Sequence, residues 1–193
     1  MAQPGANELV LIRHAPADHG GRLCGRTDVP AVIDPVLAEV MRAVMADVPQ
    51  HRMSPALRCR QTAAAIFPEI EITQDARLWE QDFGVQDGMR FEDLPDLGSL
   101  ELEELAELSA ENGESFADMV ARVQPALMEC AEAVRQSGTM AVVAHAGTVR
   151  AALALATGRL PEALSFEVGN MSVTRLRVLD GGFSVICTNW SPL

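Results

Sequence analysis

Two histidines, His14 and His145, each stand at the end of a hydrophobic run. Residues 8–12 lead to the first and residues 140–144 to the second, and small residues and a predicted helix follow each of them. If the two runs are neighbouring parallel strands, both imidazoles emerge at the sheet edge where ligands bind in open α/β sheets. Paired histidines among arginines, without the spacing of metal ligands, indicate phosphoryl transfer through a phosphohistidine.

Each histidine also has an ordinary structural explanation. Arg13 and His14 are compatible with a solvated loop pair, and His145 with a core histidine that bonds the backbone. We favour a functional interpretation because a neutral imidazole can attack phosphorus while the Arg13 guanidinium clamps the phosphoryl oxygens. The amino terminus of the helix predicted after His145 also favours anions.

A third segment, residues 54–63, could add positive charge to the same place. Ser54 and Pro55 are predicted to begin a helix, and its free N–H groups could face an anion. Arg58 lies one turn further on and could reach that anion. The alternative is an ordinary capped helix that exposes its arginines to solvent.

Phosphoryl transfer also needs an acid that protonates the leaving group, and residues 78–84 offer two candidates, Glu80 and Asp82. A carboxylic acid in a semi-enclosed loop can serve if its pKa is raised. The alternative is a pair of solvated loop acids, which is the commoner state of acidic residues.

The rest of the chain alternates predicted strands and helices. This favours an α/β fold, a three-layer α/β/α sandwich with a mostly parallel central sheet, formed by a single domain over residues 1–193. Further strands are predicted at residues 51–53, 69–73, 172–178 and 183–188, the last two joined by a turn at 180–182. Helices are predicted at residues 34–44, 54–66, 100–108, 115–136 and 147–157.

Two of these elements carry further expectations. The acidic helix at residues 100–108 is predicted to cover part of the site together with the helix that starts at Ser115. Its leucines Leu102, Leu105 and Leu108 are expected to pack rather than to form a binding surface. The last strand is a candidate edge strand and a candidate homodimer contact.

Composition narrows the possible functions. The net charge of −12 argues against nucleic acid or an anionic membrane as a partner. All 15 basic residues are arginines, which excludes a P-loop lysine and a Schiff-base lysine. The four cysteines show no CxxC spacing, and no secretory signal or bilayer-spanning run is present, so we expect a cytoplasmic protein with reduced thiols and no zinc.

Taken together and in order, four segments resemble the motifs of the histidine phosphatase superfamily, also called phosphoglycerate mutase-like. Residues 13–15 resemble its Arg-His-Gly signature, and residues 54–62 its Ser-Pro-x-x-Arg-x-x-Gln-Thr segment. Residues 78–84 are similar to its acid-bearing segment, and residues 145–147 to its second His-Gly motif; a Gly-Glu-Ser turn at 113–115 also matches. The resemblance spans about residues 8–152 and is specific because four motifs occur in order.

The resemblance implies a role for each matching residue. His14 becomes the phosphorylated nucleophile, and Glu80 the proton donor to the leaving group and then the base for water. Arg13, Arg58 and His145 form the phosphate pocket, and no metal or cofactor is required. Further contacts to phosphate or substrate are expected from Arg26, Thr27 and Ala146.

One loop favours a particular branch of the family. Residues 25–30 resemble the loop of α-ribazole phosphatase-like members, whereas phosphoglycerate mutases are longer and usually carry Trp where Arg26 stands. We therefore expect a phosphomonoesterase for a small phosphorylated metabolite, with α-ribazole 5′-phosphate as one candidate, rather than a mutase. Ala15 and Ala146 replace the usual glycines, which predicts an altered pocket shape and keeps open a non-catalytic, phosphate-binding pseudophosphatase.

Overall fold

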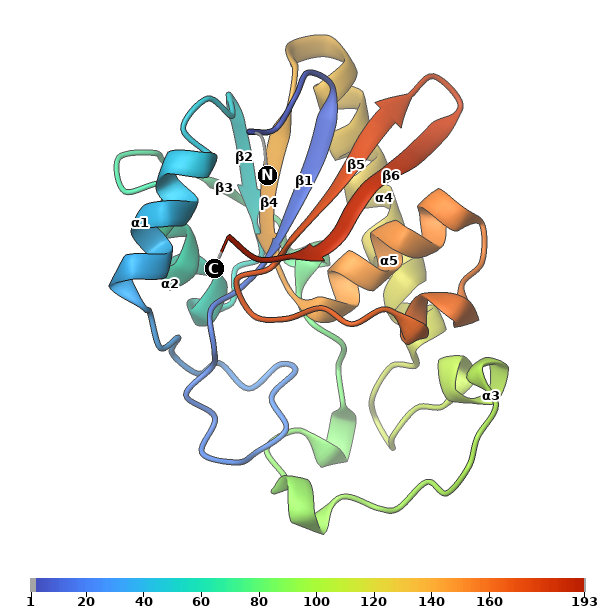
Figure 1. Cartoon of the computed structure of the whole chain (residues 1–193). Coiled ribbons are helices and arrows are strands. Elements are labelled where there is room, and N and C mark those ends of the chain that lie inside the picture. Colours follow the sequence, from blue (N-terminus) through green and yellow to red (C-terminus); the bar gives the residue numbers. More distant parts are fainter. Residues whose placement is uncertain (1–2, 193) are drawn as a thin grey trace.

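The computed structural model describes residues 3–192 and contains a six-stranded sheet (Figure 1). Its strand order is β3 (Thr73–Gln74), β2 (Gln50–Met53), β4 (Met140–Ala144), β1 (Glu8–Arg13), β5 (Val173–Leu179) and β6 (Gly182–Trp190). The first four of these strands run parallel, and β5 and β6 are antiparallel to their neighbours. The predicted mostly parallel sheet and the closing hairpin are therefore confirmed.

Helices cover both faces of the sheet, as expected for a three-layer α/β/α sandwich (Figure 1). On one side lie α1 (Pro35–Val44) and α2 (Leu57–Ile66), and on the other α4 (Phe116–Ser137) and α5 (Ala146–Thr157). Alternate residues of β1 serve the two cores: Val10 and Ile12 pack in one hydrophobic cluster, and Leu9 and Leu11 in the other. Both faces of this central strand are therefore buried, which explains its continuous apolar sequence.

Local sequence signals set several helix ends. Asp34 accepts hydrogen bonds from the first turn of α1, and Ser115 forms a capping box with Asp118 at the start of α4. Gly158 ends α5 in the left-handed conformation that favours glycine. These caps fix the helices that flank the carboxyl ends of β1 and β4.

Three predicted boundaries were wrong. Ser54 does not cap α2, which begins at Leu57 with no side-chain cap. The Ser54 hydroxyl instead bonds His145 and accepts the Ala56 N–H at 3.4 Å. The strand predicted at residues 69–73 is only the two-residue β3, since just two residues of β2 pair with it. The acidic helix is shorter than predicted and forms α3 (Leu102–Glu107).

Two long loops gather at the carboxyl ends of β1 and β4, drawn below the sheet in Figure 1. They cover residues 14–34 and 75–115, and the second contains α3 and short 3-10 turns. Backbone hydrogen bonds between Leu23 and residues 88–89 hold the two loops together. No helix within residues 3–192 is both long enough and apolar enough to cross a membrane.

Candidate active site

His14 follows directly after β1. One nitrogen of its ring forms a hydrogen bond, and the other has no hydrogen-bond partner among residues 3–192. Its backbone N–H donates to the Ala144 carbonyl across to β4 at 2.9 Å. Nδ1 lies 2.7 Å from the Ala15 carbonyl oxygen. Because a carbonyl can only accept, Nδ1 carries the proton, and Nε2 keeps its lone pair for a nucleophilic attack.

Burial keeps His14 neutral. The side chain is almost fully buried, and this loss of hydration lowers its pKa to about 3, with Arg58 and Arg13 acting in the same direction. The hydrogen bond to Ala15 opposes this shift and is weaker than it. At neutral pH the imidazole is therefore in the form that can attack phosphorus.

A distant segment, residues 166–172, holds the Arg13–His14 pair in place. The Asn170 amide donates to the His14 carbonyl at 3.0 Å, and an Arg13 Nη donates to the Val168 carbonyl at 2.6 Å. The Arg13 backbone N–H also bonds the Ser172 carbonyl. Sequence reasoning missed this segment because more than 150 residues separate it from His14, and nothing in its local pattern marks it.

Arg58 lies inside the site, not on the exposed face of an ordinary helix. It is 1% exposed, and its guanidinium donates to the carbonyls of Gly25, Thr27 and Cys24 at 2.8, 3.3 and 3.4 Å. Within residues 3–192 it forms no salt bridge with a carboxylate. A buried cation without a counter-ion is costly, and an anionic ligand would relieve that cost.

His145 joins the same cluster from the end of β4. It is fully buried, and its ring lies 5.2 Å from that of His14, centroid to centroid. Arg58 donates to its Nδ1 at 3.3 Å, so Nε2 carries the proton and donates to the Ser54 hydroxyl at 2.8 Å. Burial, with Arg58 and His14 nearby, holds the pKa of His145 far below its ordinary value.

Of the two candidate acids, the structure brings Glu80 to the cluster. The Gly147 N–H at the amino terminus of α5 lies 3.5 Å from Glu80 Oε2, and the Gln81 N–H donates to Oε1 at 3.1 Å. Asp82 instead accepts the N–H of Gly84 at 2.9 Å and so stabilises its own turn. Burial lowers the pKa of Arg13, and the nearby Glu80 carboxylate opposes that shift.

Trp79 forms a wall that the sequence did not single out. Its ring stacks on His145 with centroids 6.3 Å apart and planes 10° apart. The guanidinium carbons of Arg26 and Arg58 lie 5.6 and 6.0 Å from its ring centroid, within cation–π range. The only signal in the sequence was the position of this indole next to Glu80.

Arg26 and Thr27 lie in the loop above Arg58. Asp87 accepts both of their backbone N–H groups, at 2.6 and 3.2 Å. The Thr27 carbonyl accepts from Arg58, and the Arg26 side chain is about one-third exposed beside Glu114. The structure therefore places Arg26 and Thr27 on the outer rim of the cluster.

The two alanines that replace glycine are both accommodated by packing. Ala15 is fully buried in the core on the α1–α2 side, and its N–H donates to the Thr62 hydroxyl at 2.9 Å. Ala146 packs against the core on the opposite side. Gly147, not Ala146, is the position where space is lacking, because a Cβ there would clash with Glu80 Oε1.

Because His14 and His145 are buried, we expect the stability of the protein to depend on pH. In the folded chain the pKa values of His14 and His145 lie below the usual 6.5, so the unfolded chain binds more protons as pH falls from about 7 towards 5. The free energy of unfolding should therefore decrease in this window by up to about 1.4 kcal/mol per pH unit for each histidine.

Urea denaturation at pH 7, 6 and 5 measures how the free energy of unfolding changes with pH. His14→Gln should reduce this pH dependence, because it removes one of the histidines that resist protonation. A slope that is unchanged in His14→Gln would contradict the assignment of a depressed pKa to His14.

Comparisons with known proteins identify the family of this chain. The chain belongs to the histidine phosphatase superfamily (branch 1), whose family model matches residues 9–191. The fold is that of solved members of this superfamily, and phosphatases of small phosphorylated metabolites are among its structural neighbours. No curated protein matches the chain.

Three solved structures illustrate the likeness. Mycobacterial glucosyl-3-phosphoglycerate phosphatase, solved with VO3, has 25% identity and a TM-score of 0.81 over 96% of this chain and 100% of its own. Entamoeba histolytica phosphoserine phosphatase has 21% identity and a TM-score of 0.80, covering 96% and 98%. The α-ribazole phosphatase of Shigella flexneri has 19% identity and a TM-score of 0.80, covering 95% and 96%; at these identities the last two show the fold alone.

Proposed function

We propose that this chain hydrolyses phosphomonoesters of small metabolites through a phosphohistidine on His14, without a metal ion. The observation that carries the proposal is the uncommitted Nε2 lone pair of a neutral His14 beside Arg58, a buried cation without a carboxylate partner among the described residues. Such an arrangement binds a phosphoryl group and presents a nucleophile to it.

The reaction has two steps. In the first, His14 Nε2 attacks phosphorus, the bond to the ester oxygen breaks, and Glu80 gives its proton to that oxygen. In the second, the Glu80 carboxylate takes a proton from water, the resulting hydroxide attacks phosphorus, and the N–P bond breaks to release phosphate. Arg13 and Arg58 stabilise the charge on the phosphoryl oxygens in both transition states. His145 accepts from Arg58 at Nδ1 and so helps to position that guanidinium.

α-Ribazole 5′-phosphate is our first candidate substrate, because residues 25–30 resemble the corresponding loop of α-ribazole phosphatase-like enzymes. The proposal includes a cytoplasmic location, because the cysteines lack paired spacing. It also includes a small-molecule partner and not nucleic acid, because the net charge is −12.

The test is phosphate release from a panel of phosphomonoesters in EDTA, with α-ribazole 5′-phosphate and 3-phosphoglycerate included. We expect release that depends on His14 and is unaffected by the chelator. Interconversion of phosphoglycerates without release would indicate a mutase instead. No turnover with any ester would indicate a phosphate-binding protein without catalysis.

The close approach of Gly147 to Glu80 makes a second activity prediction. Gly147→Ala adds a Cβ that clashes with Glu80 Oε1 and with the end of the Met119 side chain, so both side chains must move. Such a displacement should lower kcat by about 10- to 100-fold. Gly181→Ala is the matched control, because no described atom outside its chain neighbours lies within 4 Å of the point that its Cβ would occupy in the β5–β6 turn. Equal activity of the two folded variants, checked by thermal melting, would contradict the role of this contact.

A further inference from the structure

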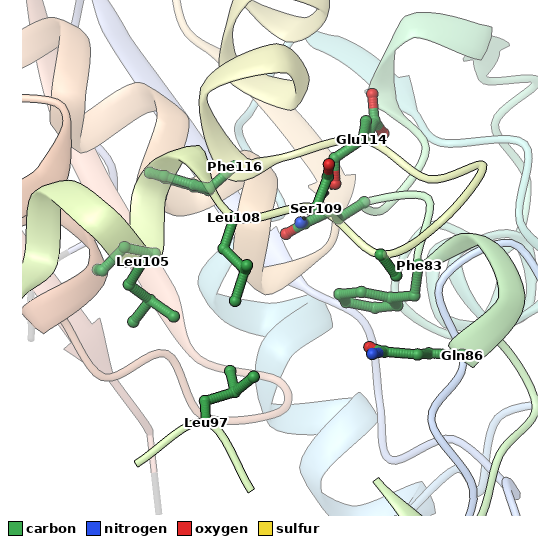
Figure 2. Close-up of a pocket in the computed structure, with 11 residues that line it drawn as sticks. Phe83, Gln86, Leu97, Leu105, Leu108, Ser109, Glu114 and Phe116 are labelled. Atoms are coloured by element: carbon green, nitrogen blue, oxygen red, sulfur yellow. Dashed lines mark hydrogen bonds between the residues drawn. The ribbon is translucent and has the colours of Figure 1, made fainter. Parts of the chain in front are cut away.

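A cavity of about 260 Å³ lies between the loop after Glu80, α3 and the start of α4. Its walls are mostly apolar, and Figure 2 shows Leu97, Leu105 and Leu108 on one side of it and Phe83 and Gln86 on the other. The large apolar side chains are Phe83, Leu97, Leu105, Leu108, Phe116 and Leu164.

Two residues that line the cavity connect it to the candidate active site. Gln81 lines it and is the residue next to Glu80, to whose carboxylate it donates its backbone N–H. Phe83 lines it and packs on Gly25, where an added Cβ would lie 2.7 Å from the Phe83 ring. The Gly25 carbonyl in turn accepts from Arg58. The cavity therefore borders Glu80 through Gln81 and is linked to Arg58 through Phe83 and Gly25.

The leucines on the outer wall keep a large part of their side-chain surface exposed. Leu97, Leu105 and Leu108 are 46%, 37% and 40% exposed. The expectation that Leu105 and Leu108 pack is not met at these exposures, and both side chains line the cavity. Apolar area left exposed in a concave site is stabilised when an apolar ligand covers it.

Within residues 3–192, the cavity carries no unpaired charge. Its one ionisable side chain, Glu114, is bound by Arg122 through both carboxylate oxygens and lies 3.7 Å from Arg26. No arginine of this part of the chain lines the cavity, so a carboxylate or a second phosphate on the substrate would find no counter-ion there. Gln81, Gln86 and Ser109 add neutral polar groups that suit hydroxyl or ring-nitrogen partners.

We propose that this cavity is the leaving-group subsite and that it selects phosphomonoesters whose alcohol carries a neutral apolar ring or chain. This inference rests on the proposed function. With the phosphoryl group between His14 and Arg58, the ester oxygen faces Glu80, and the body of the alcohol extends past Gln81 into the cavity. Esters with small or anionic alcohols leave the cavity unfilled or place a charge in it without a partner.

The test compares kcat/KM for 2-naphthyl phosphate and phenyl phosphate, whose leaving groups have similar acidity but different apolar area. We expect the naphthyl ester to be favoured by about tenfold or more, the scale on which apolar pockets discriminate. 3-Phosphoglycerate should be a poorer substrate than either. The double variant Leu105→Gln and Leu108→Gln should bring the naphthyl-to-phenyl ratio close to one.

Leu100→Gln is the matched control, because Leu100 is 38% exposed in the same segment but does not line the cavity. It should leave the ratio unchanged. Two outcomes would contradict the subsite while the proposed function stands, provided that phenyl phosphate is hydrolysed in a His14-dependent way. One is a naphthyl-to-phenyl ratio near one, and the other is a ratio that the double variant leaves unchanged. If no ester is hydrolysed, the proposed function fails and the subsite with it.

Discussion

Replacement of His14 by alanine is expected to lower kcat for every phosphomonoester by at least about 10⁴-fold, the scale seen when a nucleophile is removed. The reason is that no other group can take its place. His145 lies beside it, but Arg58 occupies its Nδ1 lone pair and its Nε2 proton bonds Ser54. The remaining cations would still bind the substrate, so KM should change much less than kcat.

Trapping the intermediate checks the assignment directly. Enzyme quenched in alkali during turnover of labelled substrate should retain one phosphoryl group, because the N–P bond of phosphohistidine survives base and is lost in acid. His51→Ala is the control, since His51 lies in β2, and should label normally. Labelling of His14→Ala would place the nucleophile elsewhere.

The second large effect concerns the leaving group. Glu80→Gln keeps the size of the side chain and its contact with the Gln81 N–H but removes the proton donor. For an alkyl phosphate we expect kcat/KM to fall by about 10²- to 10⁴-fold, the usual contribution of general acid catalysis. For p-nitrophenyl phosphate the fall should be far smaller, because nitrophenolate leaves without a proton.

The same variant should also reveal the second step. Because Glu80 is proposed to activate water, the phosphoenzyme should accumulate in Glu80→Gln and give a burst of nitrophenol. Asp82→Asn is the control, since that carboxylate accepts the Gly84 N–H and should affect both esters alike. Equal losses in kcat/KM for the two esters in Glu80→Gln would exclude Glu80 as the acid.

The sequence predicts the centre of the site well because that centre depends on strand register. Arg13 pairs with Ala144 in the parallel ladder, so His14 and His145 are the next residues of two neighbouring strands. Hydrophobic runs identify such strands locally, and parallel pairing places their carboxyl ends together.

Features that depend on tertiary partners could not be predicted in this way. A Ser-Pro pair is typical of a helix start, but the Ser54 hydroxyl bonds His145 from another strand. Leu105 and Leu108 follow a helical pattern whether they meet a core or a cavity. Asn170 reaches the His14 carbonyl across 156 positions of sequence, and no local rule describes such a contact.

The placement of the site between β1 and β4 has a consequence for evolution. Each of these strands has a hydrogen-bonded neighbour on both sides, whereas the cavity is built largely from irregular chain. Amide protons of β1 and β4 should therefore exchange with solvent only through global unfolding, and those of residues 94–101 through local opening. Mutations in the cavity can then change which ester is accepted while the strands that position His14 and His145 keep their stability.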